Sequence, residues 1–299
     1  MSQPKPMTVP SSRFDWHDPP FADGRNGARI GLQPVPKARW LTQPMLAREY
    51  HLKCQLIDTQ QSQVYACWAH DTQSQRNLAA EEALWQLAVS EGWGQRPLSL
   101  QLAPLPDSVR MLVERSPLVA LSLCVAEDLC LMWRHEGKYH LLSACVCQPS
   151  YWSLTAKIGL ALSAIHRPVA DLDSAMAGRM DRFFSKMPAH RVFARRNWSI
   201  HSEVEAFQPQ AAPDHGDCPS GTLFLRSERQ SLRRVSDDLV AFAIRVDVEP
   251  LQHVREYPQA LADLQTAVTE LSPSALCDFG GDAKRRAVLM QLRSLSADV

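Results

Sequence analysis

Two apolar runs on either side of a turn signal constrain the fold of this chain more than any other feature. Residues 129–134 and 139–147 are mostly apolar, and Glu136-Gly137 lies between them. This pattern predicts an antiparallel β-hairpin with a loop of about four residues. Residues 223–226 and 239–248 predict further strands, the latter because larger apolar residues alternate with small or polar ones.

Six other segments carry apolar residues at helical spacing. We expect Asn77 to cap the helix predicted over residues 77–90, and Gly92 to end it. Since helices and strands mix without a regular βαβ alternation, the sequence predicts an α+β fold. The expected helices are residues 44–57, 77–90, 154–164, 171–185, 258–271 and 283–295.

The N-terminal segment is proline-rich, with eight of the chain's 21 prolines in residues 1–44. Aromatic residues are interspersed among them, so we expect this segment to pack on the core as an extended arm. The predicted organisation is therefore an arm over residues 1–20 and a single domain over residues 21–299.

Charge and composition restrict the class of partner. The chain has 299 residues, 32 Lys+Arg and 32 Asp+Glu, so its formal net charge is zero. This balance argues against nucleic acid or an anionic membrane as the main partner. The start is polar and no apolar run is long enough for a membrane helix, so we expect a cytoplasmic protein. No CxxC occurs, and Cys145 and Cys147 are expected to be buried thiols.

Polar and aromatic residues concentrate in residues 148–170, 180–201 and 225–234. In the first segment, Pro168 disfavours helix at the residue before it, which places His166 near a helix end. A neutral imidazole there can bind a metal, although a structural histidine is the simpler interpretation.

The third segment has four arginines in nine residues from Arg226 to Arg234. Guanidinium groups at this density suit carboxylate or phosphate groups. The alternative is a solvated basic helix face, balanced by the acidic residues that follow.

Five sequence blocks together carry a family resemblance. Over roughly residues 14–290 the chain resembles the haem-dependent oxidative N-demethylase alpha-subunit family. The blocks are W-x-L-x-x-K-x-G at 152–159, I-H-x-P-V at 165–169, M-D-R-F-F at 180–184, R-x-N-W at 195–198 and L-R-x-E-R-Q-x-L-R-R at 225–234.

The resemblance implies a PAS-like curved antiparallel sheet whose flanking helices form a haem pocket. It also implies oxidative removal of a methyl group from a small secondary amine, with dioxygen consumed and formaldehyde released. Electrons would come from NADPH through a reductase partner that carries flavin and an iron–sulfur centre. The alternatives are a haem-binding PAS-like sensor or interaction domain without catalysis, and a relative that has lost haem.

Within this resemblance, His166 is the expected axial ligand of a haem b iron, with His201 as the next candidate. Arg226 and Arg229 are expected to meet the haem propionates, with Arg195 or Arg196 behind them. Both can reach one haem edge only if the segment is helical or turned, since an extended strand would point them in opposite directions. Carboxylate or aromatic groups for a cationic amine could come from Glu127, Asp128, Asp181 or Trp198.

Overall fold

A computed structural model describes residues 14–22, 31–42, 45–69, 74–95, 105–165, 174–210 and 221–297. The strands are β1 (Gln33–Val35), β2 (Tyr65–Cys67), β3 (Asp128–His135), β4 (Lys138–Cys145), β5 (Val192–His201), β6 (Phe224–Ser236) and β7 (Leu239–Pro250). The helices before the hairpin are η2 (Lys37–Arg39), α1 (Ala47–Thr59), α2 (Gln61–Val64), α3 (Ser74–Ser90), α5 (Asp107–Arg115) and α6 (Pro117–Ser122). The later ones are α7 (Leu154–Lys157), α8 (Leu162–Ile165), α9 (Ser174–Lys186), η3 (Leu251–Glu256), α10 (Pro258–Thr269), α11 (Pro273–Phe279) and α12 (Gly281–Ala297).

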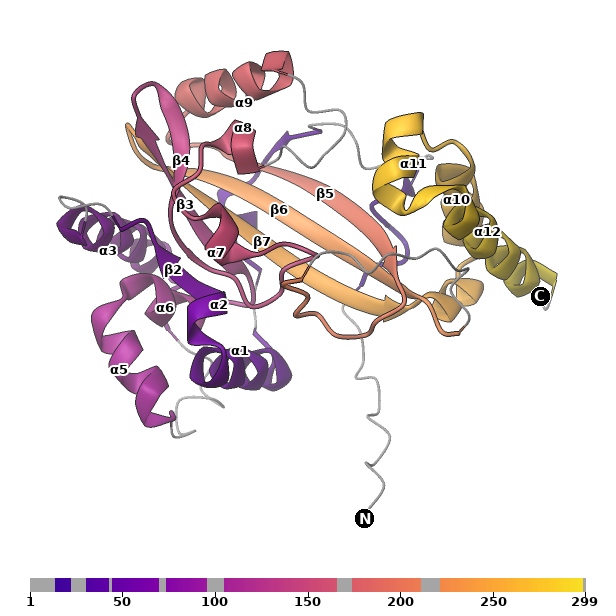
Figure 1. Ribbon diagram of the computed structural model, residues 1–299, viewed down its shortest axis with the longest axis horizontal. Helices are drawn as coiled ribbons and strands as arrows, with labels where there is room; N and C mark the ends of the chain where they lie inside the picture. The colour runs from indigo at the N-terminus through magenta and orange to yellow at the C-terminus, as the bar shows by residue number, and fades with distance from the viewer. Residues whose placement is uncertain are drawn as a thin grey trace.

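The seven described strands form one antiparallel sheet in the order β1-β5-β6-β7-β3-β4-β2. After the β3–β4 hairpin, the chain passes through α7, α8 and α9 to β5, and the β5–β6–β7 meander returns to pair with β3. Short strands β1 and β2 extend the two edges. The α+β fold expected from the sequence is confirmed (Figure 1).

The two faces of the sheet are covered by different elements. We call the face under α7, α8 and α9 the crossover face. On it, Leu154 of α7, Ile165 of α8 and Phe184 of α9 share a hydrophobic cluster with Leu232 of β6 and Val240 of β7.

The opposite face, here called the far face, carries two separate clusters. In the first, side chains from α1, α3 and α6 pack on Leu129 and Ala241. In the second, side chains from α10, α11 and α12 pack on Trp198 and Leu225. Figure 1 shows these two helical groups at opposite ends of the long strands. The middle of the far face therefore lies between two cores.

The described parts of the N-terminal segment connect these cores. Trp16 and Phe21 are buried in the second cluster, whereas Trp40 is fully buried in the first. Trp16 stacks on Tyr257 with ring centroids 5.7 Å apart. The expectation that the arm packs on the core is confirmed for these residues, while the domain boundary at residue 20 stays a prediction.

Local conformation departs from the sequence prediction at three points. The hairpin turn has two residues, Glu136 and Gly137, both at positive φ (49° and 79°), as in a type I′ turn. The helix predicted over 154–164 is split into α7 and α8 because Gly159 adopts a φ of 79°. Asn77 lies inside α3 and does not cap it, since its side chain instead donates to the Trp68 carbonyl at 3.0 Å.

The largest departure is the length of β6. The basic segment is a strand throughout. Strand β5, which the sequence analysis did not identify, pairs over its whole length with residues 224–233 of β6. Arginines on both faces of these strands obscure the alternation of apolar residues that would reveal them.

The described cysteines carry free thiols, and Cys145 and Cys147 are fully buried as predicted, whereas Cys218 lies outside the described residues. No helix in the described part of the chain has the length and apolar character needed to cross a membrane.

Candidate functional site

A row of polar side chains crosses the middle of the crossover face. Strand β5 contributes Arg195, Asn197 and Ser199, and β6 contributes Glu228 and Gln230. Because the register pairs Arg195 with Gln230 and Asn197 with Glu228, these side chains lie next to one another. We call these five residues the polar row. Polar groups on a partly buried sheet face need hydrogen-bond partners.

Hydrogen bonds fix the orientation of the polar row. The Nε of Arg195 donates to Oε1 of Gln230 at 2.6 Å, and Nε2 of Gln230 donates to Oε2 of Glu228 at 3.0 Å. Burial lowers the pKa of Arg195, and the charge of Glu228 opposes this shift. The guanidinium and the carboxylate are therefore held in place on a partly desolvated surface.

Arg226 anchors one end of the polar row. Its side chain is only 1% exposed, and its Nε donates to Oε1 of Glu228 at 3.2 Å. Its other nitrogens donate to the carbonyls of Ala206 and Gln148. This guanidinium ties two connecting segments to the sheet and orients Glu228.

Apolar side chains of β7 adjoin the polar row on the same face. Phe242 and Ile244 are half-buried, and the register places Ile244 opposite Gln230. The face thus combines an apolar strip with an ordered polar edge.

Next to Arg226, a buried histidine is held in its neutral form. Nε2 of His201 shares a hydrogen bond with Oγ of Ser199 at 2.7 Å, and the Tyr151 ring stacks on the imidazole at 4.8 Å. Burial, together with the charges of Arg226 and Lys284, lowers the pKa of His201 to about 3. Tyr151 adopts a φ of 50°, which is unusual for a bulky residue and marks this corner as conformationally constrained.

The arginines singled out in the sequence lie on different faces. Arg226 is on the crossover face, whereas Arg229 and Arg196, which are register partners, are on the far face. Because β6 is extended, Arg226 and Arg229 point in opposite directions and cannot both meet one edge of a ligand. Of the two residues expected behind them, only Arg195 reaches the polar row.

His166 lies outside the described residues, so its role as an iron ligand stays a prediction. The residue before it, Ile165, packs in the hydrophobic cluster of the crossover face. The chain therefore enters the segment that contains His166 from this face.

The four residues considered for a cationic amine do not belong to the polar row. Trp198 lies in the second far-face cluster. Glu127 accepts hydrogen bonds from Thr42, and Asp128 accepts from backbone nitrogens of residues 147 and 148. Asp181 accepts from the backbone nitrogen of Tyr139 at 3.2 Å.

Sequence reasoning did not identify Asn197, Ser199 and Gln230 as candidate site residues. The signal that could have found them is the alternation of polar residues at positions 195, 197, 199 and 201, which places them on one face of a strand. Recognising that signal requires assigning β5 first.

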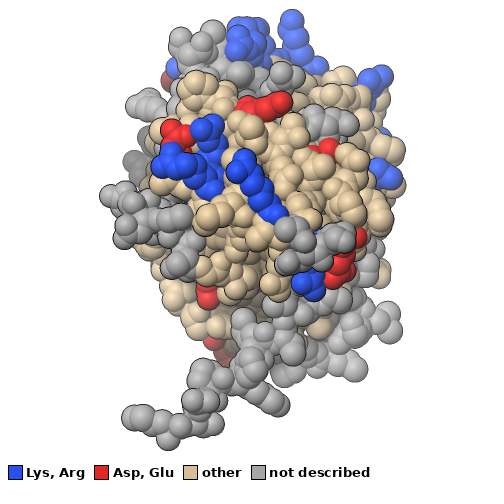
Figure 2. All heavy atoms as spheres, turned by 90° about the vertical axis from the view of Figure 1, so that its right-hand side faces the viewer, with Lys and Arg blue, Asp and Glu red and all other residues tan. Residues whose placement is uncertain are grey.

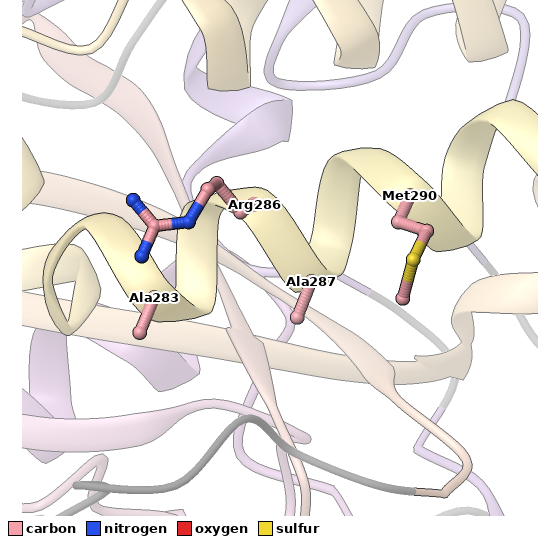
Figure 3. A pocket seen from close by; sticks show the side chains of 4 residues that line it. All are labelled: Ala283, Arg286, Ala287 and Met290. Atoms are coloured by element: carbon pink, nitrogen blue, oxygen red, sulfur yellow. The ribbon is translucent and has the colours of Figure 1, made fainter.

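A hollow lies on the outer surface of α12. It measures about 190 Å³ and is lined by Ala283, Arg286, Ala287 and Met290 (Figure 3). Met290 is 68% exposed. Figure 2 views this side of the molecule and shows mostly uncharged atoms with a few separate basic and acidic side chains. The hollow has no concentration of reactive groups.

Metal-ligand clusters and sequence comparisons bear on the cofactor. Within the described ranges, no group of three or more His, Cys, Asp or Glu residues could hold a metal ion.

Residues 46–289 match the protein family described as haem-dependent oxidative N-demethylase, alpha subunit-like. No curated protein matches the chain.

Proposed function

The chain belongs to this haem-dependent oxidative N-demethylase family, and on this premise we propose that its crossover face holds a haem b on which a small secondary amine loses a methyl group. The observation that carries the proposal is the pairing of an apolar strip on β7 with the polar row on β5 and β6. When bound, the haem iron supplies dioxygen activation and oxidation of the methyl carbon.

The residues of the crossover face fit such a cofactor. Phe242 and Ile244 offer an apolar surface to a macrocycle, and Arg195 offers a partly buried cation to a propionate. The strand order also supports a PAS-like fold, with a hairpin, a helical crossover and a three-strand meander that returns to the hairpin. In our proposal, His166, which directly follows the buried Ile165 in sequence, would hold the haem iron.

The substrate is cationic at neutral pH, so the site needs a negative charge or an aromatic face. Glu228 meets this requirement because its carboxylate is 15% exposed and lies on the crossover face. Its hydrogen bonds with Arg226 and Gln230 keep it oriented.

Electrons have to come from outside this chain, and we propose a reductase partner that passes them from NADPH through flavin and an iron–sulfur centre. The balanced charge of the chain and its free thiols support a cytoplasmic location. Formaldehyde and a primary amine are the products of the proposed reaction.

The visible spectrum of the purified full chain tests the cofactor. After haem reconstitution we expect a Soret band that shifts with dithionite and with carbon monoxide. In His166→Ala we expect much weaker haem retention with an unchanged far-UV circular dichroism spectrum. A wild-type chain that retains no haem would overturn the proposal.

Oxygen uptake separates catalysis from sensing. With an artificial reductant and dimethylamine, we expect amine-dependent oxygen consumption and an equal amount of formaldehyde. Haem binding without amine-dependent uptake would instead favour the non-catalytic PAS-like sensor.

A further inference from the structure

Three arginines stand side by side on the far face of the sheet. The register pairs Arg196 of β5 with Arg229 of β6, and Arg229 with Arg245 of β7. We call these residues the arginine row. Like charges directly opposite one another destabilise a sheet, so the row requires compensating negative charge.

The outer two arginines have that compensation within the chain. Arg196 forms an ion pair with Asp18 of the N-terminal arm at 2.9 Å. Arg245 forms ion pairs with Glu49 at 2.8 Å and with Asp247 at 3.3 Å.

The central Arg229 is compensated differently. Its NH1 and NH2 donate to the backbone carbonyls of Trp40 and Arg39, and it forms no ion pair with a carboxylate in the described part of the chain. Burial lowers the pKa of Arg229, and the charges of Arg196 and Arg39 lower it further, whereas Glu127 opposes these effects. Arg229 is therefore a half-buried cation among other cations.

The carboxyl group whose charge raises the pKa of Arg229, that of Glu127, is itself poorly suited to neutralise the arginine. Glu127 is fully buried, and burial raises its pKa against the hydrogen bonds from Thr42 and the charge of Arg245. Its Oε2 has no hydrogen-bond partner among the described residues. A carboxyl group in this environment supplies less negative charge than an exposed one.

The arginine row opens onto a cavity of about 260 Å³. Arg196, Arg229 and Arg245 line it from the sheet, and Phe14 and Pro20 line it from the arm. Three carboxylates also line it, and each has a partner: Asp18 pairs with Arg196, Asp247 pairs with Arg245, and Asp15 accepts a hydrogen bond from the backbone nitrogen of His17. The cavity lies between the two far-face clusters, because Trp198 and Ala243 of the adjoining strand positions belong to different clusters. It is large enough for a phosphate or a small carboxylic acid.

We propose that the arginine row is a binding site for a small oxyanion, a phosphate or carboxylate group that Arg229 contacts under the N-terminal arm. Guanidinium groups bind such oxyanions through paired charge-assisted hydrogen bonds. Asp18 occupies the rim of the site as an internal competitor, since its carboxylate already pairs with Arg196. The site lies on the opposite face from the polar row and does not depend on haem.

Calorimetric titration of the full chain, with and without bound haem, tests the site. The probes are inorganic phosphate and succinate, each compared with sodium chloride at equal ionic strength to remove general screening. We expect saturable binding of at least one oxyanion and a rise of about 2–5 °C in the melting temperature. Comparing the two probes identifies whether phosphate or carboxylate is the preferred group.

Variants connect the binding to the proposed residues. Arg229→Met should weaken binding by about 10-fold or more, and Asp18→Asn should strengthen it by removing the competitor. Arg110→Met is the control, because Arg110 is exposed on α5 and pairs only with Asp107 among the described residues. Binding that is absent in wild type, or equal in wild type and Arg229→Met, would refute the site. Loss of haem binding in any variant bears only on the proposed function.

Discussion

Replacing Arg226 with methionine should destabilise the whole protein, because this buried side chain connects two loop segments and Glu228 through hydrogen bonds. The variant keeps much of the aliphatic volume but removes three bonds, to Glu228, Ala206 and Gln148. Each hydrogen bond to a charged group contributes about 1.5–3 kcal/mol, and removing one partner of a buried ion pair costs about 3–5 kcal/mol. We expect the free energy of unfolding to fall by about 3–5 kcal/mol.

Urea denaturation, followed by tryptophan fluorescence and circular dichroism, measures this loss. For a slope of about 3 kcal/mol/M, the midpoint should fall by at least about 1 M. The exposed pair between Arg110 and Asp107 provides the comparison, and Arg110→Met should cost less than about 1 kcal/mol. If Arg226→Met does not fold, Arg226→Lys should retain the fold with an intermediate midpoint.

A double variant identifies the cause of the loss. If most of the lost stability comes from leaving the Glu228 carboxylate without its ion-pair partner, adding Glu228→Gln to Arg226→Met should recover part of the free energy of unfolding. A loss below about 1 kcal/mol in Arg226→Met, or a double variant whose losses simply add, would refute the reasoning that this ion pair is a coupled structural unit.

Three further predictions concern Arg195 on the crossover face, the buried His201 and the backbone at Gly159. Arg195→Met should weaken haem affinity by about 10- to 150-fold in a haem titration, whereas Arg196→Met on the far face should not; equal effects would contradict the assignment of faces. Because the pKa of His201 is about 3, below the ordinary value for histidine, the native state binds fewer protons than the unfolded state between about pH 3 and 6.5. Stability measured by urea denaturation should therefore fall as the pH drops through this window, and His201→Asn should flatten the profile. Gly159→Ala should lower the melting temperature more than Gly137→Ala, because both have a φ of 79° but only at Gly159 would a Cβ lie 2.7 Å from an indole ring; equal melting temperatures would show that the contact is relieved without cost.

The fold class could be predicted from the sequence because its strongest local signals are independent of tertiary context. The Glu136-Gly137 hairpin and the alternation in β7 each depend on neighbouring residues alone. The β5–β6 pair could not be predicted in this way. Its arginines are stabilised by contacts with distant segments, such as the Arg229 bond to the Trp40 carbonyl, 189 positions away in sequence.

The candidate site was predictable in its chemistry but not in its geometry. The density of arginines in residues 226–234 indicated anion binding as a hypothesis, which stays a prediction, yet it could not assign each arginine to a face. That assignment depends on whether the segment is a strand, which its composition does not determine because β-propensity depends strongly on context. Once β6 is known to be extended, Arg226 and Arg229 are necessarily on opposite faces.

Strand β6 therefore contributes side chains to both the crossover face and the far face of the sheet. Side chains at positions 226, 228 and 230 lie on the crossover face, and those at positions 227, 229 and 231 lie on the far face. A substitution changes the side chain on one face only, so the chemistry of either face can diverge while the other face stays the same. Inserting or deleting one residue moves every later side chain of the strand to the opposite face. Related chains can thus be expected to differ in this strand by replacement, with its length preserved.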